Sequence, residues 1–162
     1  MLDLIIRGGQ VVAPWGIGDW DVAVQGDKIV SVAAARTVTE EAVRVVDASG
    51  KIVVPGGIEP HAHIAAPFIA QGQNVSTAPP EQVSRAALFG GTTTLLDFAV
   101  QNPGIDVNQA IAERTAVWQG HSYADYSHHL TLSGQIQPNI LGQVREAIED
   151  GFASIKIFTT NV

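Results

Sequence analysis

The sequence contains no cysteine, which excludes disulfide bonds, thiol nucleophiles and thiolate metal sites together. Basic residues are also scarce: nine Lys and Arg stand against sixteen Asp and Glu, for a formal net charge of -7. So few scattered cations argue against a nucleic-acid partner, because phosphate neutralisation needs a basic face. Any metal site must therefore use His, Asp, Glu or a less common ligand.

Long hydrophobic runs are missing as well. No apolar stretch approaches about 18 residues, and no charged-then-apolar leader is present, so neither a membrane span nor a signal peptide is expected. Charged residues make up 15% of the chain and hydrophobic residues 46%, a balance that excludes intrinsic disorder. Together these features predict a globular protein of the cytoplasm that binds neither nucleic acid nor membrane.

The first third of the chain, residues 1–53, consists of short apolar segments separated by Gly and Asp. Dipeptides such as Gly26-Asp27 are typical of hairpin turns. The segments therefore predict an antiparallel sheet or sandwich, with strands expected over residues 2–6, 11–12, 21–25, 29–32, 43–46 and 51–54.

From Pro55 onward, expected strands and helices alternate, which predicts parallel βα units. Side chains expected to face inward are Ile111 and Val117 in the second helix, and Ile140, Val144 and Ile148 in the third. Four units are half of a closed barrel, and an open four-stranded sheet is the alternative, although a Gly-rich phosphate loop is missing. Strands are expected over residues 58–64, 92–98, 126–132 and 154–158, and helices over 81–89, 107–118 and 139–150.

His61-Ala-His63 is the sharpest candidate for chemistry. If residues 58–64 are extended, the two imidazoles point to the same face and can share one ion. The same pattern also fits two surface histidines without a ligand. The position favours a site, because the pair follows Pro55-Gly-Gly at the end of a strand, where parallel βα sheets place their sites.

The segment Val54-Pro-Gly-Gly-Ile-Glu-Pro-His-Ala-His-Ile64 resembles the metal-binding signature of the cyclic amidohydrolases: hydantoinases, dihydropyrimidinases, allantoinases and dihydroorotases. Three more segments resemble that family in order and spacing: residues 3–9, 86–98 and 151–158. The Leu-Asp-Phe ending of the second and Ser-Ile-Lys-Ile-Phe in the third are most similar to the hydantoinase/dihydropyrimidinase group.

This resemblance implies an α/β fold with a metal-dependent (β/α)8 TIM-like barrel. Residues 54–162 would form its first four βα units, and residues 1–53 would be a β-sandwich portion shared with a C-terminal segment not present here. The family's two histidines on the fifth and sixth strands and its aspartate on the eighth would also lie elsewhere. We therefore expect the N-terminal part of a longer or split enzyme, completed by about 250 to 320 residues and assembled as a dimer or tetramer.

The resemblance also implies the site. His61 and His63 would bind the more buried of two divalent ions, and Lys156 would be the catalytic group that bridges both ions as a carbamate. An ammonium cannot ligate, whereas addition of carbon dioxide gives an anion with two oxygens. The expected metal is zinc, with manganese, iron or nickel as alternatives. Without the resemblance, Lys156 fits a snorkelling side chain or a buried ion pair.

Three weaker candidates for contacts to the ligands or the substrate are Asp97, His129 and Asn161. Asp97 comes late in its strand, and a hydrogen bond within the barrel is favoured over a role at the site. His128 and His129 point to opposite strand faces and cannot chelate together; His129 matches a family histidine and either faces the site or fills a core role. Asn161 stands where hydantoinases typically have a tyrosine.

The expected activity is opening of a cyclic amide, imide or ureide ring by a metal-activated hydroxide. Asn161 in place of tyrosine predicts a substrate other than plain hydantoin or dihydropyrimidine. A smaller departure is Glu59, where the family usually has Asp. Two alternatives are a dihydroorotase/allantoinase-type amidohydrolase and a non-catalytic assembly homologue, and retention of His61, His63 and Lys156 counts against the second.

Overall fold

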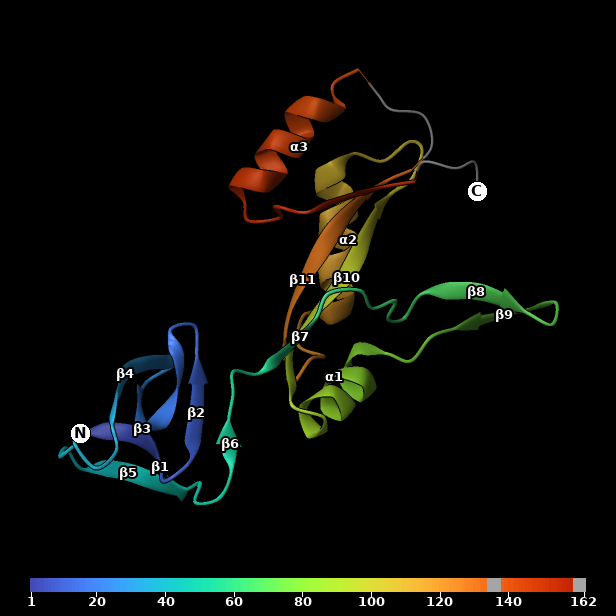
Figure 1. The fold of residues 1–162 in the computed structure, drawn as a ribbon. Coiled ribbons are helices and arrows are strands. Elements are labelled where there is room, and N and C mark those ends of the chain that lie inside the picture. Colours follow the sequence, from blue (N-terminus) through green and yellow to red (C-terminus); the bar gives the residue numbers. More distant parts are fainter. Residues whose placement is uncertain (134–137, 159–162) are drawn as a thin grey trace. The chain divides into compact units, whose positions relative to one another are not determined.

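The computed structural model describes residues 1–133 and 138–158 (Figure 1). The chain divides into two compact units, Met1–Pro55 and Gly56–Val162. Of the helices in the described ranges, none combines the length and apolar character that a membrane crossing requires.

The first unit is a six-stranded mixed sheet in the order β5-β1-β3-β2-β6, with β4 paired to β3. β3 runs antiparallel to β1, β2 and β4, and the β3–β4 pair is the hairpin that Gly26-Asp27 predicts. The expected antiparallel sheet or sandwich describes only these pairs, because β5 pairs with β1 and β6 with β2 in parallel. Turn signals report only on strands adjacent in sequence. The bounds are β1 (Leu2–Arg7), β2 (Gln10–Ala13), β3 (Gly16–Gln25), β4 (Lys28–Ala34), β5 (Ala42–Asp47) and β6 (Ile52–Val53).

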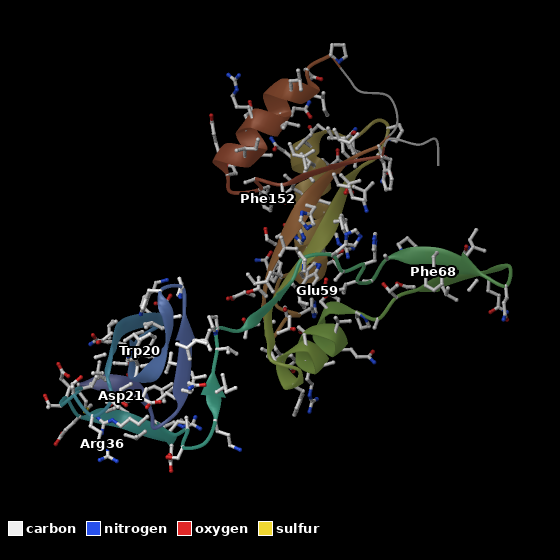
Figure 2. All side chains as sticks on the ribbon, in the orientation of Figure 1. Trp20, Asp21, Arg36, Glu59, Phe68 and Phe152 are labelled. Atoms are coloured by element: carbon white, nitrogen blue, oxygen red, sulfur yellow. The ribbon has the colours of Figure 1, made fainter. Side chains whose placement is uncertain are left out.

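Packing in this unit combines a small apolar core with one buried carboxylate. Leu2, Ile5, Ala23 and Val38 form the core cluster. Asp21, labelled in Figure 2, is fully buried and accepts a 2.9 Å hydrogen bond from the backbone N–H of Arg36. This bond ties the chain after β4 to the sheet.

The second unit is a parallel sheet in the order β12-β11-β10-β7. Figure 1 shows β10 and β11 side by side, with α2 along them. The alternation of strands and helices in this unit confirms the predicted α/β class. The bounds are β7 (Gly57–Glu59), α1 (Pro80–Phe89), β10 (Thr92–Gln101), α2 (Val107–Trp118), β11 (Asp125–Leu132), α3 (Ile140–Glu149) and β12 (Ile155–Ile157).

The helices bury apolar residues against one face of this sheet in two clusters. The first cluster comprises Ala99, Val107, Ile111, Leu130, Ile140, Val144 and Ala147, and the second comprises Ile64, Leu95, Trp118 and Ala124. The inward placement predicted for Ile111, Ile140 and Val144 is confirmed. The same expectation was wrong for Val117 and Ile148, which are 38% and 44% exposed, because Trp118 and Ala147 occupy the inward positions beside them.

The expected strand over residues 58–64 was also wrong, because β7 ends at Glu59. Pro60 follows and has no N–H to continue a ladder. The Glu59 side chain then accepts a 2.9 Å hydrogen bond from the backbone N–H of His61, which turns the chain out of the strand. The two histidines therefore lie on a loop beyond the strand.

A hairpin that the sequence reading did not anticipate follows this loop: β8 (Pro67–Ala70) pairs antiparallel with β9 (Gln73–Ser76). Its turn residues Gln71 and Gly72 both have positive φ, 51° and 77°, which is the requirement of a tight two-residue hairpin. Figure 2 marks Phe68 on this hairpin, where its side chain is 48% exposed.

Candidate metal site

The alternation of side chains along β10 and β11 divides the sheet of the second unit into two faces. Phe98 lies beside His129, and Lys156 lies beside Thr131, on one face, which we call the site face. Asp97 lies beside His128 on the opposite face, which we call the helix face. The predicted opposite orientation of His128 and His129 follows directly from this register.

Four polar side chains surround the ring of Phe98 on the site face. The ring of His63 stacks on it at a centroid distance of 4.5 Å, and the ring of His61 meets its edge at 4.7 Å. The ring of His129 lies 5.2 Å away, and the Lys156 Nζ lies 4.2 Å from the Phe98 centroid. The structure thus brings His61, His63 and Lys156 together around one aromatic ring.

His129 uses both ring nitrogens to hold neighbouring segments. Its Nε2 lies 2.6 Å from the carbonyl oxygen of Pro60, and its Nδ1 lies 2.6 Å from Ser154 Oγ. Because a carbonyl can only accept, Nε2 carries the hydrogen and Nδ1 is free to accept from the hydroxyl. His129 therefore links the histidine loop to the segment that leads into β12.

Asp97 points to the helix face, opposite to the face that carries the Phe98 ring. Its Oδ2 accepts 2.8 Å hydrogen bonds from Arg114 Nε and Trp118 Nε1, and Oδ1 accepts one from the backbone N–H of Phe98. This is the hydrogen bonding within the barrel that the sequence analysis favoured for Asp97. Asn161 lies outside the described residues.

The donors on the site face fit a divalent ion by type. Burial lowers the pKa of His63, with the charges of Lys156 and His61 acting in the same direction, so its neutral ligating form is favoured near neutral pH. The centroids of His61 and His63 are 5.4 Å apart. Within residues 1–133 and 138–158, however, no three His, Cys, Asp or Glu side chains gather closely enough to hold an ion alone.

A cavity of about 490 Å³ opens beside these donors. His63 and Phe98 form one wall, and Glu113, Arg114 and Val117 of α2 form another. The space therefore lies between His63 and the outer helix α2.

The sequence analysis missed Phe98, Arg114 and Trp118 as parts of this region. An available signal was the inward stripe of α2, where Arg114 falls between Ile111 and Trp118. An arginine in a buried stripe needs a partner, and Asp97 supplies it.

The family model of the Amidohydrolase family matches residues 44–146. The D-hydantoinase of Geobacillus stearothermophilus is 36% identical over 155 residues, covering 95% of this chain and 32% of that protein. Rat (Rattus norvegicus) dihydropyrimidinase is 34% identical over 140 residues, covering 80% and 25%. A solved D-hydantoinase from a Bacillus sp. superposes with a TM-score of 0.86 at 31% identity, covering 98% of this chain and 34% of that one.

The parallel sheet and its helices place the second unit among α/β folds, and the family match makes the chain a member of the amidohydrolase family. Within that family its relatives include hydantoinases and dihydropyrimidinases, which confirms the resemblance read from the motifs. The fold agrees with the N-terminal portion of solved hydantoinases, as predicted. The chain spans about a third of the length of the hydantoinases that it matches. Metal dependence is general in this family.

Proposed function

We propose that this chain provides part of the active site of a metal-dependent hydrolase that opens the ring of a cyclic amide, imide or ureide. One observation carries the proposal: His61 and His63, on the loop after β7, and Lys156 of β12 converge on the ring of Phe98. Two relatives that carry the names D-hydantoinase and dihydropyrimidinase support the substrate class.

In this proposal His61 and His63 hold one of two divalent ions, and Lys156, carboxylated on Nζ, bridges the two. When bound, the ions would polarise the ring carbonyl and lower the pKa of a water molecule. Phe98 forms an apolar floor against which the two imidazoles pack. His129 holds the histidine loop in place through Pro60. The domain boundary proposed from sequence, near residues 53–54, would separate this part from the β-sandwich portion.

Metal content and lysine chemistry test the proposal directly. In the complete protein that contains this chain, two divalent ions per active site and a mass increase of one carbon dioxide on the peptide carrying Lys156 are expected. Elemental analysis after purification without chelator, and peptide mass analysis under non-acidic conditions, provide the readouts. Loss of both signals in the His61→Ala/His63→Ala variant is expected. Absence of any divalent ion from the wild-type protein would contradict the proposal. Zinc is the expected ion.

The substrate is the second part of the proposal. We expect turnover of a cyclic imide, ureide or lactam to exceed that of plain hydantoin or dihydrouracil, because Asn161 replaces the tyrosine common in hydantoinases. Parallel assays of hydantoin, dihydrouracil, allantoin and a cyclic imide decide the matter. Strong dihydrouracil activity would contradict this expectation. A preference for allantoin would favour the allantoinase-type alternative, and a 29% identical relative carries the name allantoinase.

The proposed protein includes the remaining ligands, supplied by further residues of the same polypeptide or by a complementary chain. It assembles as a homo-oligomer in the cytoplasm, where a cysteine-free sequence needs no oxidising environment. Size-exclusion chromatography coupled to light scattering on the complete protein measures the assembly.

A further inference from the structure

The loop that carries the two histidines, residues 60–64, lies outside the strand ladder and is held by individual contacts. At its start, His129 Nε2 bonds the Pro60 carbonyl, and the Glu59 carboxylate accepts from the His61 N–H. In its middle, the Ala62 N–H donates to the Leu96 carbonyl of β10 at 3.0 Å. At its end, the Ala65 N–H donates to the Ala78 carbonyl at 2.9 Å, and the Ile64 carbonyl has a restraint of its own.

Arg114 of α2 supplies that restraint. Its Nη2 donates to the carbonyl oxygen of Ile64, the residue directly after His63. The two residues are fifty positions apart in sequence, so this contact joins the histidine loop to the outer helix. The Arg114 side chain is 14% exposed, and therefore water competes poorly for the bond.

Asp97 fixes the guanidinium that makes this contact. Nε and Nη2 of Arg114 both donate to its Oδ2, and Trp118 Nε1 donates to the same oxygen. The Asp97 side chain is 2% exposed, so the ion pair is buried. A planar guanidinium offers several donors in a rigid fork, and it can bind a carboxylate and a carbonyl at once.

We propose that Arg114 is the positioning residue of the His61–His63 metal pair and that Asp97 is its anchor. A fixed Ile64 carbonyl sets the backbone direction immediately after His63, and so the direction in which its imidazole is presented. A lysine at position 114 would keep the positive charge next to Asp97. It lacks the planar fork of donors with which arginine reaches both the Asp97 carboxylate and the Ile64 carbonyl oxygen. The proposal rests on the proposed function, because it assigns a role toward the ion that His61 and His63 would hold.

Metal affinity in the complete protein tests this role. Arg114→Lys is expected to weaken Zn²⁺ binding about 10- to 100-fold in a chelator competition, the loss typical when groups that orient metal ligands are changed. The visible absorption of the Co²⁺-substituted protein should shift, because the ligand geometry changes. Far-UV circular dichroism should stay that of the wild type. Arg145→Lys, an exposed arginine on α3, is the matched control and should bind Zn²⁺ like the wild type.

A second variant covers the case in which Arg114→Lys does not fold. Asp97→Asn/Arg114→Gln removes both buried charges together, so no charge is left unpaired, and it should also weaken Zn²⁺ binding and shift the Co²⁺ spectrum. Zn²⁺ affinity within twofold of wild type in a folded variant, with an unchanged Co²⁺ spectrum, would overturn the positioning role alone. A wild-type protein that takes up no divalent ion would overturn the proposed function and this inference together.

Discussion

Neighbouring residues on two strands of the parallel sheet have very different surroundings. On the helix face, Asp97 and His128 are 1% and 2% exposed and lie among packed side chains of α2. On the site face, His129 is half-buried and His61 and His63, beside the same Phe98 ring, are exposed. Side chains along β10 and β11 alternate between the two faces of the sheet. Polar groups on the helix face are therefore fixed by burial, whereas those on the site face are open to a ligand.

The largest expected effect comes from removing the lysine of the site face. Lys156→Met should lower kcat/KM of the complete protein about 10³-fold, because two bridged ions stabilise the transition state by several kcal/mol and each 1.36 kcal/mol is a factor of ten. Steady-state hydrolysis of the wild type's best substrate measures it. Lys51→Met, an exposed lysine of the first unit, should leave kcat/KM unchanged. A kcat/KM within tenfold of wild type in Lys156→Met would show that the site face does not serve catalysis through this lysine.

On the helix face, Asp97→Ala should cost about 3–5 kcal/mol of unfolding free energy, because it leaves the buried Arg114 cation unpaired. Urea denaturation followed by circular dichroism measures the loss. Asp125→Ala removes an exposed carboxylate at the start of β11 and should change stability by less than about 0.5 kcal/mol. Equal losses in the two variants would show that burial does not separate the two faces.

His128 gives the comparison a pH dependence. Burial lowers its pKa from 6.5 to about 4 in the folded protein, and its ring nitrogens have no hydrogen-bond partner among the described residues. The unfolded chain therefore binds a proton first as the pH falls. The stability contributed by neutral His128 is complete above pH 6.5 and is lost as the pH falls toward 4, by about 3 kcal/mol.

His128→Phe should remove this part of the pH dependence, because phenylalanine fills the aromatic cluster without a titrating group. Unfolding free energies of both proteins at pH 7.5 and pH 4.5 provide the measurement. The unfolding free energy of the variant minus that of the wild type should be larger at pH 4.5 than at pH 7.5. A constant difference would mean that His128 is not buried in its neutral form.

The smallest expected effect concerns the close approach of β7 to β10, on which both faces depend. A Cβ at Gly56 would lie 2.1 Å from Thr93 Oγ1, so Gly56→Ala should destabilise the protein by about 1–3 kcal/mol. Gly142→Ala is the control, because no atom of the described residues outside its own helix lies within 4 Å of a Cβ there and the position is helical. That variant should be stabilised by about 0.5–1 kcal/mol in thermal unfolding. Destabilisation in both would argue against a specific contact at Gly56.

Much of the second unit could be predicted because its signals are local. The helix over 107–118 was predicted with the bounds that the structure has, and in the structure Asp106 caps its start. The family motifs located His61, His63 and Lys156. The parallel strands of the first unit could not be predicted in the same way, because pairing between distant segments leaves no local signal.

The supporting contacts of the candidate site were beyond the sequence for a related reason. The bond from Arg114 to Ile64 and that from His129 to Pro60 join residues 50 and 69 positions apart. Only the fold brings them together. The short β7 was missed because alternation of Ile58, Pro60 and Ala62 looks like a strand, whereas Pro60 and the Glu59 side chain end it.

The early end of β7 also affects how the protein opens locally. Backbone N–H groups within β10 and β11 exchange with solvent only when a buried ladder breaks, which takes a large part of the global unfolding free energy. The N–H of His61 depends instead on a single carboxylate, that of Glu59. This N–H can therefore exchange without any strand separating, while the remaining contacts hold the loop. Because both imidazoles are already exposed, an incoming ion can meet them while the loop stays in place.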